Sequence, residues 1–196
     1  WNEPAFRVVF AESDGLPGLI ADRFGPWLVV QTLALGVEVR RGFLVEALRH
    51  FTAARGVYLR NDAPVRELEG LPAHSGPWPG SDDLPARVQI EESGVKFWVD
   101  VAAGQKTGHF LDQRFNRAAL APLVGGARVL DAFCYTGGFA VHAAAGGARE
   151  VVGVEASPWA VEVARENANL NGVQERCRFE TANAFDYLRL LDQQKE

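Results

Sequence analysis

Acidic and amide side chains follow three successive strand-like segments in the C-terminal half of the sequence. Asp131 and Glu155 each end a short apolar run, and Asn183 follows the segment Arg176–Thr181. Polar groups at successive strand ends of an α/β sheet meet at the edge where such proteins bind nucleotides. This order therefore predicts a nucleotide-like ligand held by these three side chains.

The loop after Asp131 separates two classes of ligand. It reads F-C-Y-T-G-G-F, with glycine only at Gly137 and Gly138. A dinucleotide pyrophosphate requires G-x-G-x-x-G, and that spacing is absent. S-adenosylmethionine has no phosphate, and its methionine end carries an ammonium and a carboxylate. We expect Asp131 to bind the ammonium, and the Gly137 and Gly138 amides at a helix N-terminus to bind the carboxylate.

Further residues complete the predicted cofactor site. Glu155 lies about 20 residues past the glycine loop, where an acid accepts hydrogen bonds from a ribose diol. Asn183 has an amide that both donates and accepts, which suits an adenine edge. The remaining cofactor-binding candidates lie in these loops or at the start of the preceding helix: Phe110, Gln113, Arg114, Phe133, Tyr135, Thr136, Ala156 and Ala184.

Strands and helices alternate around these residues. A helix is expected at Phe139–Ala145, and another at Pro158–Leu170 with Ser157 as its N-cap. Residues 88–196 are therefore expected to form a Rossmann-like α/β fold that binds S-adenosylmethionine, as a methyltransferase domain does. It is expected to be incomplete, because a nucleotide-binding α/β sheet needs more strands than these three.

The N-terminal part predicts a different architecture. Residues 1–70 are expected to form a small α+β domain. Its main elements are three strands and a helix, at Arg7–Phe10, Trp27–Leu33, Val57–Leu59 and Glu38–Ala54. Residues 71–87 are rich in Pro, Gly, Ser and Asp and are expected to be a linker or an exposed loop.

Composition restricts the remaining classes of function. The chain is 47% hydrophobic, with a net charge of −5 and a pI near 5.4, which argues against a broad basic surface for nucleic acid. Cys134 and Cys177 lack C-x-x-C partners, so neither a metal site nor a disulfide framework is indicated. A reducing cytoplasm fits this composition, and no apolar run is long enough to span a membrane.

Several motifs together resemble one known family. They are F-R-V-V-F-A-E-S-D-G-L-P-G-L-I-A-D-R-F-G at Phe6–Gly25, N-D-A-P-V-R-E-L-E-G at Asn61–Gly70, V-D-V-A-A-G-Q-K-T-G-H-F-L-D-Q-R at Val99–Arg114, V-L-D-A-F-C-Y-T-G-G-F at Val129–Phe139 and N-A-F-D at Asn183–Asp186. The chain resembles the RlmI (YccW) family of S-adenosylmethionine-dependent methyltransferases, which act on cytosine C5 of 23S ribosomal RNA.

The resemblance implies a PUA domain before this chain and a catalytic part after it. The nucleophilic cysteine, whose thiolate adds to C6 of the cytosine, is then expected beyond Glu196. Cys134 is expected to pack beside the cofactor and Cys177 to be buried, so the chain by itself is expected to be inactive. The resemblance also implies a 23S rRNA substrate, and relatives look like homodimers.

Three alternatives stay open at this point. Another RNA base could be the substrate, because the loop that holds the target base is expected outside the chain. An NAD-dependent oxidoreductase is disfavoured by the missing G-x-G-x-x-G pattern. A non-catalytic RNA-binding module is disfavoured by the acidic pI.

Overall fold

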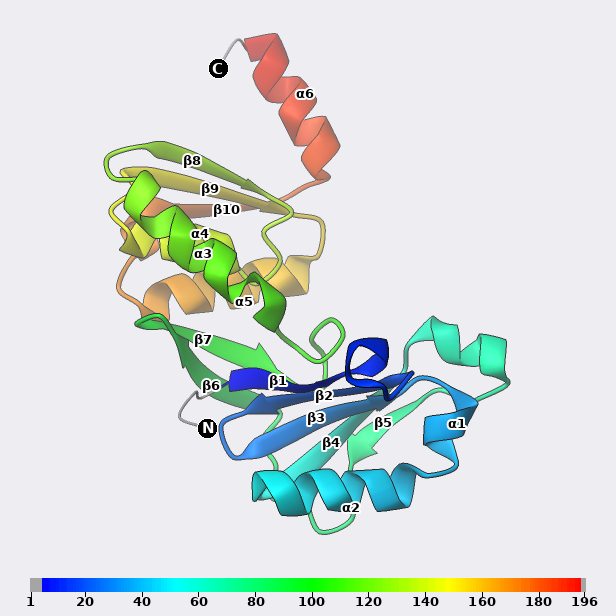
Figure 1. Ribbon diagram of the computed structural model, residues 1–196. Coiled ribbons are helices and arrows are strands. Elements are labelled where there is room, and N and C mark those ends of the chain that lie inside the picture. The colour runs from blue at the N-terminus through cyan, green and yellow to red at the C-terminus, as the bar shows by residue number, and fades with distance from the viewer. Residues whose placement is uncertain (1–4, 195–196) are drawn as a thin grey trace. The chain divides into compact units, whose positions relative to one another are not determined.

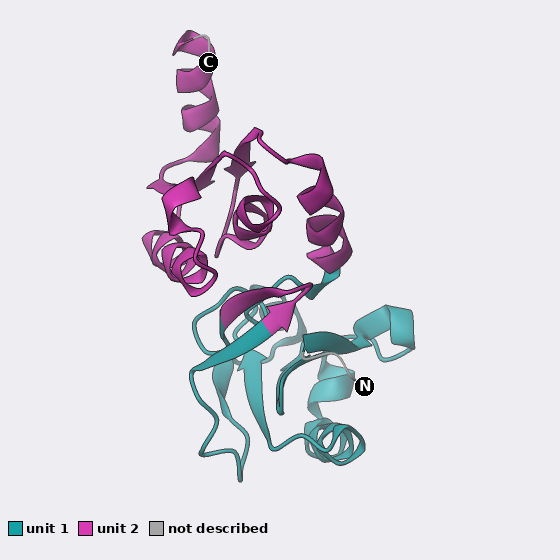
Figure 2. Cartoon of the chain, turned by 90° about the vertical axis from the view of Figure 1, so that its left-hand side faces the viewer, with its two compact units in different colours: residues 1–90, 99–112 teal, residues 91–98, 113–196 magenta. Residues whose placement is uncertain are grey.

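The computed structural model describes residues 5–194 of the chain (Figure 1). These residues form two compact units, shown in different colours in Figure 2. Among them, unit 1 contains residues 5–90 and 99–112, and unit 2 contains residues 91–98 and 113–194. The division passes through one hairpin, formed by β6 (Arg87–Glu92) and β7 (Val95–Asp100).

Unit 1 is a five-stranded sheet with strand order β1-β2-β3-β4-β5. The strands are β1 (Ala5–Phe10), β2 (Leu19–Phe24), β3 (Trp27–Thr32), β4 (Gly56–Asn61) and β5 (His74–Pro77). All neighbours are antiparallel except β3 and β4, which are parallel. The parallel pair requires a crossover, and the chain supplies it as the helices α1 (Leu35–Glu38) and α2 (Arg41–Thr52).

The core of unit 1 lies between α2 and one face of this sheet. Val45 of α2 is fully buried, and it packs in a cluster with Leu28, Val30 and Val57 of the central strands. Short 3-10 helices at Ala11–Asp14 and Pro64–Glu69 follow β1 and β4. The α+β character expected from the sequence is therefore present in this unit.

Strand β5 lies within the stretch expected to be a linker. His74–Pro77 pairs antiparallel with β4, and His74 is the register partner of Asn61. The Nδ2 atom of Asn61 also lies 3.2 Å from Nε2 of His74. This part of residues 71–87 is therefore a sheet strand, since backbone pairing outweighs its turn-rich composition.

Unit 2 is built on three parallel strands with the order β10-β9-β8. They are β8 (Arg128–Ala132), β9 (Glu150–Glu155) and β10 (Cys177–Thr181). The helices are α3 (Arg114–Leu120), α4 (Gly138–Ala145), α5 (Pro158–Leu170) and α6 (Ala184–Gln194), with short 3-10 helices at Leu111–Gln113, Ala121–Leu123 and Gln174–Arg176. In Figure 1, α4 and α5 cover one face of the sheet and α6 rises from the other. This is the predicted Rossmann-like α/β arrangement.

Local sequence determines the boundaries of α5. Its predicted range matches the structure, and the Ser157 side chain accepts a hydrogen bond from the Ala160 amide at 3.3 Å. A serine at this position satisfies one of the amides that the first helical turn leaves without a partner.

A buried ion pair that the sequence did not indicate lies inside unit 2. Arg117 of α3 donates from Nε and Nη2 to the two carboxylate oxygens of Glu92, at 2.7 and 2.8 Å. Both side chains are almost fully buried. His142 of α4 lies beside this pair, with Nε2 3.7 Å from Glu92, and stacks on Phe97 at 5.3 Å. The hairpin segment of the unit is thus joined to α3 and α4.

No helix among residues 5–194 is both long and apolar enough to cross a membrane.

Candidate functional site

Asp131 is placed by the end of β8 against the start of α4. Its Oδ2 accepts a hydrogen bond from the Ala140 amide at 2.9 Å, which orients the carboxylate along the first turn of the helix. The pKa of Asp131 is raised to about 6: burial raises it most, the Ala140 hydrogen bond opposes the rise, and the charge of Glu155 adds to it. A buried carboxylate next to a second acid is stabilised in its ionised form by a cation, so an ammonium group fits here.

The glycine loop differs in one respect from the expected carboxylate site. The Gly137 amide donates to the Cys134 carbonyl at 2.8 Å, so it is not available in the way predicted. Gly138 begins α4, and an amide in the first turn has no acceptor within the helix. The assignment of a ligand carboxylate therefore moves from the Gly137 amide to the first turn of α4.

Glycine is required at position 137 by the backbone conformation and by the close packing of the loop. Its φ is +80°, and a Cβ there would lie 3.1 Å from Cβ of Ala164 and 3.4 Å from the Phe179 ring. Phe133 and Tyr135 also have positive φ, at 67° and 49°. Strained backbone of this kind clusters at binding sites, because the surrounding structure must hold it.

Glu155 fixes the loop by bridging two backbone segments. Its Oε2 accepts from the Tyr135 amide at 3.1 Å, and its Oε1 accepts from the Ser157 amide at 2.9 Å. Each carboxylate oxygen can accept a further hydrogen bond, so a ribose diol fits an acid held in this way. Tyr135 itself is buried, and it contributes its backbone amide while its ring lies 6.2 Å from that of Trp159.

Asn183 has a structural task that the sequence did not reveal. Its Oδ1 accepts from the Phe185 amide at 2.9 Å and from the Asp186 amide at 3.4 Å, so it caps α6. The oxygen is committed to the helix, and Nδ2 is the part of the amide that suits an adenine acceptor. Asn183 was predicted both to donate to and to accept from the adenine; with Oδ1 occupied, only donation from Nδ2 remains.

Two exposed aromatic rings lie next to these polar groups. The Phe133 and Phe185 rings meet edge to face with centroids 5.4 Å apart, and their exposed fractions are 58% and 61%. Apolar rings this exposed suit the faces of a purine. Phe185 was not among the predicted residues, although it lies in the N-A-F-D motif that was.

The other predicted residues divide into three groups. Thr136 and Ala184 are buried, and the Thr136 carbonyl accepts from Asn167 Nδ2 at 3.0 Å, which is a packing role. Ala156 is exposed beside Glu155. Gln113 and Arg114 lie at the start of α3 in unit 2, and Phe110 lies in unit 1. The contact of these last three with a cofactor stays a prediction.

Neither cysteine is suited to be a nucleophile. Cys134 is buried, and burial raises the pKa of its thiol far above the ordinary value, with Asp131 and Glu155 adding to the effect. Burial also raises the pKa of Cys177 to about 11. Both side chains are protonated thiols at neutral pH, and thiols are much weaker nucleophiles than thiolates. Cys177 is only half-buried, less than expected, because it is the first residue of β10.

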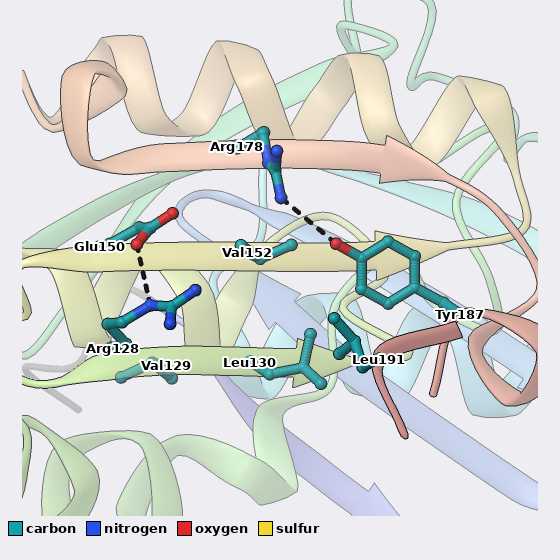
Figure 3. Close-up of a pocket in the computed structure, with 8 residues that line it drawn as sticks. All are labelled: Arg128, Val129, Leu130, Glu150, Val152, Arg178, Tyr187 and Leu191. Carbon is teal, nitrogen blue, oxygen red and sulfur yellow. Dashed lines mark hydrogen bonds and ion pairs between the residues drawn. The ribbon is translucent and has the colours of Figure 1, made fainter. Parts of the chain in front are cut away.

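A pocket of about 240 Å³ lies on the sheet face beside α6 (Figure 3). Leu130 and Val152 form its floor, with Tyr187 and Leu191 from α6 at one side. Two interactions span it: Arg128 Nε to Glu150 at 3.1 Å, and Arg178 Nη2 to the Tyr187 hydroxyl at 3.3 Å. None of the predicted cofactor residues lines this pocket, so it is distinct from the strand-end site.

The strand-end residues fit S-adenosylmethionine better than a dinucleotide. Asp131, Glu155, the first turn of α4 and the Phe133–Phe185 pair match an ammonium, a diol, a carboxylate and a purine. The loop has bulky side chains where a pyrophosphate-binding loop needs glycine.

Comparison with known proteins gives the same assignment. A model of the S-adenosylmethionine-dependent methyltransferase family matches residues 65–191. Ribosomal RNA large subunit methyltransferase I from Aeromonas hydrophila is 45% identical over 185 residues, covering 94% of this chain and 47% of the relative. The enzyme of that name from Klebsiella pneumoniae is 42% identical over 193 residues, covering 98% and 48%. The resemblance inferred from the motifs is confirmed, and the chain spans about half the length of these curated relatives.

Solved structures show the same fold. A protein from Streptococcus mutans, assigned as a SAM-dependent methyltransferase, has a TM-score of 0.84 at 25% identity and covers 98% of this chain and 50% of its own. A second structure with the same score and identity, covering 98% and 49%, is a complex with S-adenosylhomocysteine. Together with the match of the family model, these findings show that the chain belongs to the S-adenosylmethionine-dependent methyltransferase family.

Proposed function

We propose that the chain binds S-adenosylmethionine for a methyltransferase that modifies RNA of the large ribosomal subunit. The observation that carries the proposal is the pair of acids at adjacent strand ends, each oriented by backbone amides. The identity to curated large-subunit rRNA methyltransferases supports the choice of substrate.

Each residue would act on a different part of the cofactor. Asp131 would hold the ammonium, the first turn of α4 the carboxylate, and Glu155 the ribose. Asn183 Nδ2 would donate to the adenine edge, and Phe133 with Phe185 would cover its face. When bound, the cofactor supplies an electrophilic methyl group, and these contacts fix where that group lies.

The finer details rest on the family resemblance. Cytosine C5 of 23S rRNA is the proposed target, with the cytoplasm as the site of action and a homodimer as the assembly. Cytosine C5 methylation requires a thiolate, and the protonated thiols of Cys134 and Cys177 support a nucleophile outside residues 1–196.

Cofactor binding is tested by calorimetric titration of S-adenosylhomocysteine into the full-length protein. Asp131→Ala is expected to weaken binding at least about tenfold, the value of one charge-assisted hydrogen bond. Asp192→Ala is the matched control, because Asp192 is exposed on α6 in the same unit. A well-folded protein that binds no S-adenosylhomocysteine would contradict the proposal.

The substrate is tested with radiolabelled S-adenosylmethionine and large-subunit rRNA that lacks the modification. Label is expected in the rRNA, and bisulfite sequencing is expected to find it at a cytosine. Label on another base would retain the enzyme class and change the target. Label that appears only in protein would refute an RNA substrate.

A further inference from the structure

A second pocket, of about 510 Å³, lies entirely within unit 1. Three basic side chains line it, Arg7, Arg60 and Lys106, with one acid, Asp62. The remaining lining is amide and apolar: Phe10, Ile20, Gln31, Leu33, Ala63, Pro64 and Gln105. Nothing in the cofactor site described above uses these residues.

The pocket is where three sequence motifs outside the glycine loop converge. Arg7 and Phe10 come from Phe6–Gly25, Asp62 to Pro64 from Asn61–Gly70, and Gln105 with Lys106 from Val99–Arg114. These motifs are far apart in the sequence. Because these motifs surround one polar cavity, and a hydrophobic core would have apolar residues there, we infer that they form a binding site.

A buried acid holds the walls of this pocket in place. Asp22 is fully buried, and its two oxygens accept from Nε and Nη2 of Arg7, each at 2.8 Å. The Thr107 hydroxyl donates to the same carboxylate, which fixes the G-Q-K-T-G loop against β2. Gly108 lets the same loop pass close to the end of β7, because a Cβ there would lie 2.8 Å from the Asp100 carbonyl oxygen.

The charges leave one cation without an acid. Asp22, and more weakly Asp112, offset Arg7, while Asp62 accepts from Arg60 at 3.2 and 3.0 Å. Lys106 is exposed, and among residues 5–194 no carboxylate pairs with it; its Nζ lies 5.1 Å from the centroid of the Phe110 ring. Lys106 therefore offers the pocket an ammonium group that no carboxylate of the described residues holds, and such a group suits a singly charged phosphodiester.

Donors remain to complete an anion site. A guanidinium has five N–H groups. Arg60 uses three of its own, two to Asp62 and one to the Val101 carbonyl at 3.2 Å, and Arg7 uses two to Asp22. These two guanidinium groups are held rigidly, so little side-chain entropy is lost when they bind an anion.

Two further features bear on the ligand: the backbone of Lys106 indicates a functional site, and the Phe10 ring favours a nucleotide over a bare anion. Lys106 has a φ of 53°, a conformation that costs energy for a residue other than glycine and that is retained where function requires it. The Phe10 ring is 50% exposed, with the Arg7 guanidinium 4.9 Å from its centroid. An exposed aromatic ring can stack on an unpaired base, and neighbouring N–H groups without an acceptor can bind the phosphate of the same nucleotide.

We propose that this pocket binds one nucleotide of single-stranded RNA, with its phosphodiester at Lys106 and its base against Phe10. The inference rests on the proposed RNA substrate, and it assigns part of the substrate contact to unit 1 rather than to the cofactor unit.

The test compares lysine variants of the full-length protein by fluorescence anisotropy with a labelled single-stranded RNA of about 12 nucleotides. Lys106→Gln is expected to weaken binding about tenfold at low salt and to reduce the salt slope of the affinity by about 0.7, the value for one phosphate contact. Lys96→Gln is the matched control, because Lys96 is exposed in unit 2, and it is expected to change neither quantity.

A second pair of variants tests the base contact. Phe10→Ala is expected to weaken RNA binding about fivefold or more, the loss of one stacked base. Phe51→Ala removes a more exposed ring, 82% exposed on α2 of the same unit, and is expected to have no effect. Thermal melting of all four variants shows whether each is folded.

Parallel titration with S-adenosylhomocysteine separates this inference from the proposed function. RNA affinity that falls in Lys106→Gln while S-adenosylhomocysteine affinity is unchanged supports the pocket. Affinities for both ligands that fall together would assign Lys106 to the cofactor site and overturn it. RNA affinity that is unchanged in Lys106→Gln would also overturn it. A wild type that binds RNA but not S-adenosylhomocysteine would refute the proposed function alone.

Discussion

Asp131 and Glu155 end two neighbouring parallel strands, where burial, and after it the charge of Glu155, raises the pKa of Asp131 to about 6. The Ala140 hydrogen bond opposes this rise without cancelling it. Two acids placed so that one resists ionisation form a site that is completed by a cation. This is the electrostatic reason to assign the ligand ammonium to Asp131.

The raised pKa predicts that ligand-free stability falls as pH rises. In the unfolded chain Asp131 ionises near its ordinary value of 3.8, while the folded protein holds the proton until about pH 6. The contribution of this group is therefore most favourable below pH 3.8 and is lost between there and about 6, at a cost of about 3 kcal/mol. Asp131→Asn is expected to be more stable than wild type near pH 8. Urea unfolding at about pH 5 and about pH 8 measures the difference.

Cofactor binding should have the opposite pH dependence. An ammonium group favours the ionised form of Asp131, so S-adenosylhomocysteine is expected to bind more tightly as pH rises through about 6. The affinity of Asp131→Asn should be weaker and nearly independent of pH in this range. Glu155→Gln should move the inflection of the Asp131 profile to lower pH, because one of its causes is removed. An unchanged inflection in calorimetry would show that the two acids do not interact.

Asn183 allows helix capping and cofactor contact to be separated. Asn183→Ala is expected to lose about 1 kcal/mol of stability, since the amides of Phe185 and Asp186 lose their acceptor. Asn183→Asp keeps an acceptor at the helix N-terminus and removes the Nδ2 donor. It should therefore melt like wild type while binding S-adenosylhomocysteine more weakly. If both properties stay at the wild-type level in Asn183→Asp, the adenine assignment is wrong.

The Glu92–Arg117 pair should be the most sensitive ion pair of unit 2. Arg117→Ala leaves a buried carboxylate without its main partner, and is expected to cost about 3–5 kcal/mol in the free energy of unfolding. Arg128→Ala breaks an exposed pair with a single hydrogen bond, whose side chains are 59% and 45% exposed, and is expected to cost less than about 1 kcal/mol. Chemical denaturation of both variants compares them directly. Equal losses would show that neither burial nor the second hydrogen bond decides the strength of these pairs.

Much of unit 2 could be predicted from local sequence. Ser157 and Pro158 mark the start of α5, and short apolar runs ending in Asp131 and Glu155 mark two strands. Such signals act between residues close in the chain, so they survive without knowledge of the fold. The same is true of the loop chemistry that favoured S-adenosylmethionine over a dinucleotide.

Contacts between distant residues could not be predicted in this way. Glu92 and Arg117 are charged and lie 25 positions apart in the sequence, yet they are buried against one another. Two contacts between residues close in the chain also could not be predicted: the Gly137 amide donates to the Cys134 carbonyl, and Asn183 Oδ1 accepts from the Phe185 amide of α6. In each case the choice of partner depends on backbone geometry that only the folded chain defines.

The sequence by itself determined the family, the cofactor class and the order of the strand-end residues, because these follow from residue type and spacing. Only the tertiary structure decided that His74–Pro77 is a strand of unit 1, and that Lys106 shares a pocket with Arg7 and Arg60. The physical reason is that sheet pairing and charge balance arise between segments far apart in the chain, whose proximity no local pattern records.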